Sequence, residues 1–300
     1  MERWDGNEAR CAAAGCRTLL SDELAASCRK TREGPAWLER LPGMIGELTR
    51  RWSLALGAPF DSSAAWVAPA ERGDGRRVVL KIGMPHMESA HEIDGLRWLD
   101  GDPTVRLLEA DGELDAMLLE RCDPGHPLSR MTEPEQDAVV ARLLPRFWGR
   151  RPAAGHPFRP LSAMIAHWRE ETLAAAPEGV DRGLIQEGLR LLEDLSRPAA
   201  GDVLLATDLH AGNVLRAQRE PWLAIDPKPF IGDRAYDATQ HLMNCRGRMR
   251  AAPDATIRRF AELLEVEPAR VRLWMFARAA AEPRDVWDGE LFEIARALKS

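Results

Sequence analysis

Three oxygen-bearing side chains lie close together in the C-terminal half of this 300-residue sequence. Asn213 follows Asp208 by five residues, and Asp226 follows Asn213 by thirteen. The segment VLRAQREPWLAID, residues 214–226, predicts a β-hairpin that would return Asp226 to the side of Asn213. An amide oxygen and a carboxylate suit Mg²⁺, and a further carboxylate could orient an attacking hydroxyl group. Each residue alone is an ordinary turn residue, but the spacing of all three favours a magnesium-dependent site.

Lys81 is a second candidate, because it lies within the apolar strand-like segment RRVVLKIG, residues 76–83. Strand interiors rarely bury an ammonium group that has no partner. The position therefore indicates either a paired functional lysine or a lysine on an edge strand that faces water.

The elements that would position Lys81 form a small α+β unit. We expect strands over 63–70 and 76–83, and two more strands within 104–122 joined by a turn at Asp111-Gly112. Apolar residues at helical intervals predict helices over 37–52 and 87–101. Pro42-Gly43 could break the first of these helices.

After residue 123 the pattern becomes helical and is interrupted only by short strand-like runs around Asp208 and Asp226. Helices are predicted over 133–150, 161–176, 181–197, 256–266, 269–282 and 290–299. The expected fold class is therefore α+β in two lobes, with a sheet-rich N-lobe over 34–120 and a larger helical C-lobe over 121–300. Residues 1–33 are expected to be an N-terminal tail or extension, with one weak helical segment.

Charge and cysteine content narrow the classes of partner and location. The sequence has 41 basic and 47 acidic residues and a net charge of −6, which argues against binding to nucleic acid or to an anionic membrane. The same balance is compatible with a cationic ligand. Five cysteines without a CxxC pair, no apolar run of about 20 residues and no signal-like N-terminus predict a cytoplasmic protein.

The motifs around the three oxygen-bearing residues resemble a known family. DLHAGN at 208–213, followed by ID at 225–226, is similar to the catalytic and metal-binding loops of the aminoglycoside phosphotransferases. AIDPKPFIGDRAYDATQHLMN, residues 224–244, resembles the streptomycin 6-kinase and hydroxyurea kinase branch, which carries IDPKP followed by GDPAYD. AWLERLP, RWSLALGAPF, VLKIG and MLLERCDPG extend the resemblance over roughly residues 35–245.

This resemblance implies a two-lobed protein-kinase-like fold and a phosphotransferase that uses ATP and Mg²⁺. Asp208 would be the catalytic residue that orients the acceptor hydroxyl group, and Asn213 and Asp226 would be the magnesium ligands. Lys81 would bind the α- and β-phosphates of ATP. Its expected partner is Glu92, with Glu88 as the alternative.

The resemblance also implies supporting roles. Residues 118–122 would form the hinge that binds adenine through backbone groups, including those of Glu120 and Cys122. Asp237 would accept hydrogen bonds from backbone amides of the catalytic loop, with Asp233 either assisting or serving as an N-cap. Lys228 would contact phosphate or substrate or lie in solvent, and His210 would support the loop or contact substrate.

Two features depart from the family pattern. The segment FDSSAA, residues 60–65, lies where the phosphate-covering loop is expected, but it has no glycine. Ala206-Thr207 replaces the His-Gly that usually precedes the catalytic aspartate, which removes an imidazole that supports the loop. A kinase-like module without turnover is therefore an alternative to an active enzyme. Streptomycin is the acceptor that the resemblance favours, and hydroxyurea, choline or another small alcohol remains open.

Overall fold

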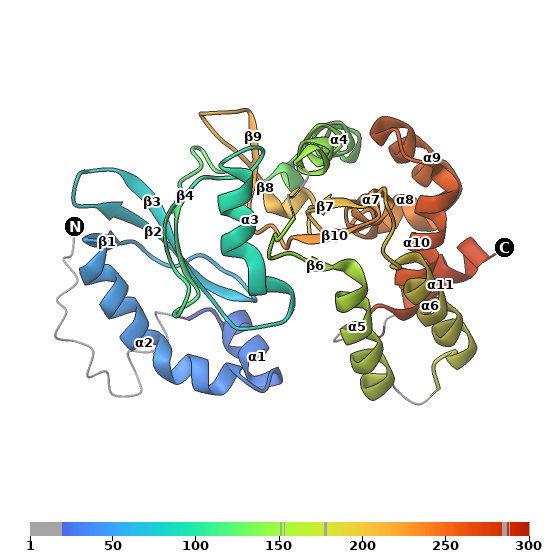
Figure 1. The fold of residues 1–300 in the computed structure, drawn as a ribbon, viewed down its shortest axis with the longest axis horizontal. Coiled ribbons are helices and arrows are strands. Elements are labelled where there is room, and N and C mark those ends of the chain that lie inside the picture. Colours follow the sequence, from blue (N-terminus) through green and yellow to red (C-terminus); the bar gives the residue numbers. More distant parts are fainter. Residues whose placement is uncertain are drawn as a thin grey trace. The chain divides into compact units, whose positions relative to one another are not determined.

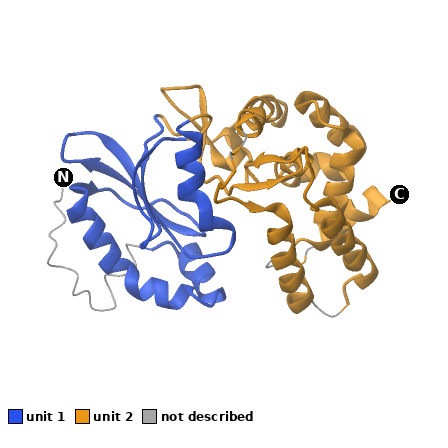
Figure 2. Ribbon diagram, in the orientation of Figure 1, with its two compact units in different colours: residues 1–101, 105–123 blue, residues 102–104, 124–300 orange. Residues whose placement is uncertain are grey.

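The computed structural model describes residues 20–150, 152, 154–176, 179–283, 287 and 289–299. The chain forms two compact units (Figure 2). Unit 1 comprises residues 1–101 and 105–123, and unit 2 comprises residues 102–104 and 124–300. Along the sequence, the main division lies between residues 123 and 124, and the short segment 102–104 belongs to unit 2.

Unit 1 contains a five-stranded antiparallel sheet, seen among the blue and green elements of Figure 1. Its strand order is β1 (Leu54–Leu56), β2 (Ala65–Arg72), β3 (Arg77–Gly83), β5 (Ala116–Glu120) and β4 (Leu107–Asp111). The four predicted strands are confirmed. β1 was not predicted, because its three residues are too few for the alternation of apolar and polar side chains to be recognised.

Helices α1 (Asp22–Lys30) and α2 (Gly34–Arg51) supply much of the core of unit 1. The buried face of α2 packs against one face of the sheet, the face to which Leu80 points. Leu24 and Cys28 of α1 belong to the same hydrophobic cluster. We expected residues 1–33 to be a tail or extension with one weak helical segment. In the structure, residues 20–33 include helix α1, which packs against the core of unit 1. Residues 1–19 lie outside the described residues.

The predicted break in α2 is wrong, because the helix continues through Pro42. Pro42 and Gly43 are both exposed, whereas Trp37, Leu41 and Ile45 are buried on the opposite side. Burial of this apolar face outweighs the loss of one backbone hydrogen bond at the proline.

A short 3-10 helix, η2 (Glu88–His91), precedes α3 (Glu92–Leu99). The predicted helix over 87–101 is therefore confirmed only in its C-terminal part. Asp100 ends α3 with φ of 47°, and Gly101 follows with φ of 78°, so the chain reverses immediately after the helix.

Unit 2 is mainly helical, as predicted, and the ends of the six predicted helices lie within three residues of the expected positions. These helices are α4 (Glu133–Gly149), α5 (Leu161–Ala175), α6 (Arg182–Leu195), α9 (Pro253–Leu264), α10 (Pro268–Ala281) and α11 (Gly289–Lys299). Two more helices, α7 (Arg234–Met243) and α8 (Arg246–Ala251), lie near α9 and α10 in Figure 1. α10 is buried on most sides, and Gly188 of α6 allows close contact, since a Cβ there would lie 2.8 Å from Ala280 and Ala281.

Short strands hold the loops of unit 2. β6 (Arg159–Pro160), β10 (Phe230–Gly232) and β7 (Val203–Leu205) form one sheet, with β10 in the centre. β8 (Val214–Arg216) and β9 (Trp222–Ala224) form an antiparallel hairpin in which Val214 pairs with Ala224. The predicted hairpin is therefore confirmed. 3-10 helices η3 (Leu128–Arg130) and η4 (Ala211–Asn213) complete this part of the chain.

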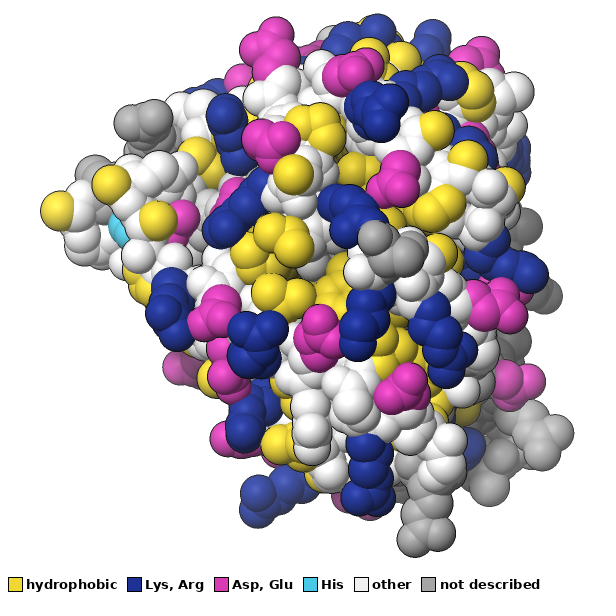
Figure 3. Space-filling view, turned by 90° about the vertical axis from the view of Figure 1, so that its right-hand side faces the viewer, with side chains coloured by type: hydrophobic (Ala, Val, Ile, Leu, Met, Phe, Trp, Pro, Cys, Tyr) yellow, Lys and Arg dark blue, Asp and Glu magenta, His cyan; other side chains and the backbone are white. Residues whose placement is uncertain are grey.

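Charges of both signs are mixed on the surface. Figure 3 shows one face, on which Lys and Arg side chains are interspersed with Asp and Glu. Within the described part of the chain, no helix combines the length and the apolar character needed to cross a bilayer. Cys28, Cys122 and Cys245 form no disulfides.

Candidate active site

In unit 1, Lys81 and Glu92 form a buried ion pair. The ammonium nitrogen of Lys81 lies 2.6 Å and 2.7 Å from the two carboxylate oxygens of Glu92. Lys81 is only 7% exposed and Glu92 only 2% exposed. β3 is flanked by β2 and β5, so the interpretation of Lys81 as an edge-strand lysine is wrong. Successive side chains along a strand point to opposite faces of the sheet. Leu80 therefore points into the core of unit 1, and Lys81 points to the other face, toward Glu92 at the start of α3.

The expected hinge, residues 118–122, begins within β5 and continues past the end of that strand at Glu120. The backbone N–H of Glu120 donates to the carbonyl of Arg106 at 2.9 Å, and the Glu120 carboxylate accepts from the Arg106 amide at 3.0 Å. The Glu120 side chain therefore anchors the neighbouring strand segment. Cys122, two residues later, is half-buried and forms no disulfide. The glycine-free segment 60–65 connects β1 to β2, and Phe60 N–H donates to Val67 at 2.8 Å.

In unit 2, three strands bring the predicted oxygen-bearing residues together. Asp208 follows β7, and Asn213 ends η4 directly before β8. The β8–β9 hairpin then returns the chain, and the N–H of Ile225 donates to the carbonyl of Asn213 at 2.9 Å. Asp226 comes next, with φ of 55°, a left-handed conformation that Asp tolerates better than most residues.

The carboxylate of Asp208 is held from two sides. Lys228 Nζ lies 2.5 Å from Oδ2, and Gln240 Nε2 donates to Oδ1 at 2.6 Å. Lys228 Nζ is also 4.0 Å from Asp226, so this ammonium group lies near both carboxylates. Lys228 was predicted from the sequence. Gln240 was not, because a glutamine within a helix carries no sequence signal for a distant partner.

Asn213 is oriented by Asp208. Its side-chain N–H₂ donates to the backbone carbonyl of Asp208 at 3.0 Å and lies 3.4 Å from its carboxylate. The amide nitrogen thus faces Asp208, so the amide oxygen is directed elsewhere. That oxygen and the carboxylate of the adjoining Asp226 are hard donors of the kind that Mg²⁺ prefers, so these residues fit a magnesium site.

His210 shapes the loop between Asp208 and Asn213. Its Nδ1 accepts a hydrogen bond from Gly212 N–H at 3.1 Å, and its Nε2 lies 4.0 Å from Asp208. A Cβ at residue 212 would lie 2.7 Å from the imidazole, so glycine is needed there. Burial lowers the pKa of His210, although the nearby Asp208 opposes this shift. The neutral ring can therefore accept the backbone hydrogen bond.

Asp237 supports the start of the catalytic loop. Its carboxylate accepts from the backbone N–H of Ala206 at 3.0 Å, from that of Thr207 at 2.9 Å and from the Trp148 indole at 2.8 Å. Asp237 is 1% exposed, and burial raises its pKa to about 6 despite these three donors. Trp148, which comes from α4, was not predicted from the sequence.

Ala206 and Thr207 tie two loops together. The Thr207 hydroxyl donates to the carbonyl of Lys228 at 2.5 Å, and the Lys228 N–H donates to the carbonyl of Ala206 at 3.2 Å. Thr207 has φ of 47°, which is unusual for a β-branched residue and common for glycine. The loop thus keeps the backbone conformation of a glycine and gains a hydroxyl contact.

Asp233 has a structural role. It is the N-cap of α7, where its side chain accepts from Ala235 N–H at 2.9 Å. The same carboxylate accepts from Arg270 at 2.6 Å and from the Trp274 indole at 2.9 Å. The N-cap interpretation of Asp233 is therefore confirmed.

A buried cluster of Asp137, His241 and Cys245 has ligand types that could bind a metal. His241 Nε2 lies 2.8 Å from Asp137, and Arg248 donates to both Asp137 oxygens at 2.7 Å and 2.8 Å. Arg248 Nη2 also lies 3.1 Å from the Cys245 sulfur. The guanidinium group supplies the cation, so this cluster is an ion-pair network between α4, α7 and α8.

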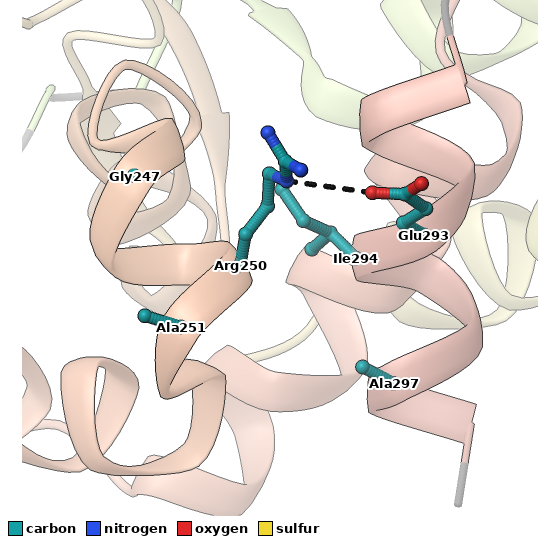
Figure 4. A pocket seen from close by; sticks show the side chains of 6 residues that line it. All are labelled: Gly247, Arg250, Ala251, Glu293, Ile294 and Ala297. Carbon is teal, nitrogen blue, oxygen red and sulfur yellow. Dashed lines mark ion pairs between the residues drawn. The ribbon is translucent and has the colours of Figure 1, made fainter.

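A pocket of about 400 Å³ lies between α8 and α11 (Figure 4). Its two charged side chains, Arg250 and Glu293, face each other and form an ion pair at 3.4 Å. The pocket shares no residue with the Asp208 cluster, and its small lining residues offer no reactive group.

Comparison with known proteins identifies the family. A family model described as aminoglycoside/hydroxyurea antibiotic resistance kinase matches residues 51–287. A streptomycin 6-kinase from Streptomyces glaucescens is 36% identical over 284 residues, which cover 90% of this chain and 91% of that protein. A hydroxyurea phosphotransferase from Kitasatospora aureofaciens is 41% identical over 221 residues, which cover 70% of this chain and 63% of that protein.

The fold has relatives among solved structures. That of a spectinomycin phosphotransferase in complex with ADP and spectinomycin aligns with a TM-score of 0.55 at 14% identity, covering 86% of this chain and 98% of that one. This likeness establishes the protein-kinase-like fold that the motifs predicted. Together with the family match over most of the sequence, it shows that the chain belongs to the aminoglycoside/hydroxyurea antibiotic resistance kinase family and is an O-phosphotransferase.

Proposed function

We propose that this enzyme transfers the γ-phosphoryl group of ATP, with the help of Mg²⁺, to a hydroxyl group of a streptomycin-like aminoglycoside. The observation that carries the proposal is the Asp208 carboxylate, held by Lys228 and Gln240 beside Asn213 and Asp226. A fixed carboxylate next to hard oxygen donors is the arrangement that phosphoryl transfer to an alcohol requires.

Asp208 would accept a hydrogen bond from the acceptor hydroxyl group and orient its oxygen toward the γ-phosphorus. Two donors already contact the carboxylate and restrict its orientation. Such a carboxylate contributes mainly by orientation, and takes the hydroxyl proton as the new oxygen–phosphorus bond forms. The bond from the γ-phosphorus to the ADP oxygen breaks in the same transfer.

Asn213 and Asp226 would hold Mg²⁺, which neutralises charge on the phosphate oxygens when bound. Lys228, near both Asp208 and Asp226, would reduce the repulsion between these carboxylates and contact phosphate. Lys81 would bind the α- and β-phosphates of ATP, with its ammonium group fixed by Glu92. Backbone groups of the hinge, residues 118–122, would bind adenine.

The contacts of Ala206 and Thr207 favour an active enzyme over a kinase-like module without turnover. Asp237 accepts hydrogen bonds from both backbone amides, and the Thr207 hydroxyl links this loop to Lys228. The missing histidine therefore does not leave the loop without support. These contacts fix the segment that precedes Asp208, which is what orientation of an acceptor requires.

The acceptor is proposed from the relatives. The streptomycin 6-kinase aligns over nearly the whole of both chains, which favours streptomycin, a cationic aminoglycoside. A specific observation supports hydroxyurea as the second candidate, because the hydroxyurea phosphotransferase has the higher identity over a shorter alignment. We expect the enzyme to act in the cytoplasm, the location predicted from the sequence, because ATP is available there.

The test is a phosphoryl-transfer assay with MgATP and, separately, streptomycin, other aminoglycosides and hydroxyurea. We expect a phosphorylated product with streptomycin, detected by mass spectrometry, and loss of turnover by at least about 100-fold in Asp208→Ala. Lys81→Ala should raise the KM for ATP or lower kcat, because the phosphate contact is lost. The matched control is Arg234→Ala, an exposed residue on α7.

Each outcome has a distinct meaning. Turnover that survives Asp208→Ala would exclude the mechanism, whatever the acceptor. Product with hydroxyurea alone would retain the mechanism and replace the proposed acceptor. Binding of MgATP without transfer to any of these acceptors would favour the module without turnover.

A further inference from the structure

The side chain of Gln240 contacts the residue that the proposed function places at the centre of the chemistry. Its Nε2 donates to Asp208 Oδ1 at 2.6 Å, while Lys228 contacts the other oxygen, Oδ2. The two donors come from different elements, α7 and the loop before β10. Together they restrict rotation of the carboxylate about its Cβ–Cγ bond, because each oxygen has its own partner.

The orientation of the Gln240 amide is set by Arg278 of α10. Arg278 Nη2 donates to Gln240 Oε1 at 2.6 Å, so the amide oxygen faces the guanidinium group and the N–H₂ group faces Asp208. The reversed amide would place its oxygen against a carboxylate and its N–H₂ against a cation, and both contacts would be repulsive. Only one orientation of Gln240 is therefore compatible with its neighbours.

Arg278 is itself held rigidly inside unit 2. It is 1% exposed, and its guanidinium group donates to Thr239 at 2.7 Å and to Glu282 at 2.7 Å and 3.0 Å. The guanidinium carbon lies 4.7 Å from the centroid of the Tyr236 ring and 5.6 Å from that of the Trp168 ring. These contacts leave the arginine little freedom, and Glu282 balances its charge.

We propose that Gln240 is a positioning residue for Asp208, and that Arg278 fixes Gln240 in the orientation that donates to the carboxylate. This inference rests on the proposed function, in which Asp208 orients the acceptor hydroxyl group. A neutral amide restrains the carboxylate without adding a second full positive charge beside Lys228. The hydrogen bond from Gln240 occupies one lone pair of Asp208 Oδ1. The acceptor hydroxyl group must therefore donate to a different lone pair of this carboxylate.

The first test compares two substitutions of Gln240 in the full-length enzyme, assayed with MgATP and streptomycin. Gln240→Ala removes the donor, and kcat should fall by about 10- to 100-fold while the KM for ATP changes by less than about twofold. Gln240→Glu keeps the shape but replaces the donor with an acceptor, so kcat should fall at least as far. A role in packing alone predicts the opposite order, with Gln240→Glu close to the wild type.

The second test addresses Arg278. Arg278→Lys keeps a positive charge but loses the planar donor pair, so kcat should fall. The double variant Arg278→Lys/Gln240→Ala should have the same kcat as Gln240→Ala, because both changes act on one contact with Asp208. Urea unfolding of each variant separates loss of folded protein from loss of turnover, and Arg234→Ala, an exposed residue on the helix that carries Gln240, is the control.

The outcomes separate this inference from the proposed function. If Asp208→Asn abolishes turnover while Gln240→Ala and Gln240→Glu keep the wild-type kcat, only the positioning role is overturned. If Asp208→Asn keeps full turnover, the proposed function fails first. Even if Arg278→Lys does not fold, the two Gln240 variants decide the question.

Discussion

At the scale of single residues, Thr207 combines an unfavourable backbone conformation with a favourable side-chain contact. Its φ of 47° lies in the left-handed region, where a β-branched residue costs roughly 1–2 kcal/mol. Its hydroxyl donates to the buried loop carbonyl of Lys228, and its N–H donates to Asp237. The hydroxyl contact explains why threonine is stable here, where the family pattern has glycine.

Thr207→Val should therefore destabilise the protein. Valine keeps the β-branched shape but cannot donate to Lys228, so a buried carbonyl loses its partner at a cost of about 1–2 kcal/mol. Thr207→Ser keeps the hydroxyl group and is the matched control. The free energy of unfolding in urea measures the effect, and kcat should fall together with it because the loop precedes Asp208. Equal stability of the valine and serine variants would contradict this account.

At the scale of secondary structure, α2 carries a proline that its exposed face tolerates. Pro42→Ala should restore a backbone hydrogen bond within the helix and stabilise the protein by about 1–3 kcal/mol. Gly43→Ala is the matched comparison, since a Cβ there meets no atom within 4 Å, and its gain should be only about 0.5–1 kcal/mol. Thermal unfolding would measure both changes. A lower melting temperature for Pro42→Ala would mean that the proline has a role in the native helix that its exposure does not reveal.

The elements also show what the sequence could predict. Alternating apolar residues were enough for β2 to β5, and helical periodicity was enough for the six long helices of unit 2. The break at Pro42 was predicted from local preference, which the burial of Trp37 and Leu41 overrides. The packing of α1 was missed because only Leu24 and Cys28 of this short helix reach the core.

The residues of the candidate site also fall into two groups, those that the sequence predicted and those that it did not. Asp208, Asn213 and Asp226 lie within one short stretch of sequence, and the hairpin between Asn213 and Asp226 brings the ends of that stretch together, so their spacing was informative. Gln240 and Trp148 contact Asp208 and Asp237 from 32 and 89 residues away. Such contacts depend on how α4 and α7 pack around the loop, and no local pattern encodes that packing.

At the scale of the whole molecule, the ion-pair network of Asp137, His241 and Arg248 links the stability of unit 2 to pH. Burial lowers the pKa of His241, but the hydrogen bond to Asp137 and the proximity of Cys245 outweigh it and raise the pKa to about 9. Burial raises the pKa of Asp137, but Arg248 and His241 outweigh it and lower the pKa to about 2. Both charged forms are thus favoured in the folded state.

The sign of the resulting pH dependence follows from these two shifts. The folded pKa of His241 is above its ordinary value of 6.5, so its contribution is complete below pH 6.5 and is lost as the pH rises through 9. The folded pKa of Asp137 is below its ordinary value of 3.8, so its contribution is complete above pH 3.8 and is lost as the pH falls through 2. The network therefore stabilises the fold most between pH 3.8 and 6.5.

We expect the free energy of unfolding to fall by about 3 kcal/mol between pH 6.5 and 10 through His241 alone. Other groups titrate in this range, so the measurement is the difference between the wild type and His241→Gln in urea unfolding at several pH values. Glutamine can donate to Asp137 but cannot gain a proton, so this variant should show a flatter dependence on pH. Parallel curves for the two proteins would mean that His241 is neutral in the folded state, and that Arg248 alone balances the charge of Asp137.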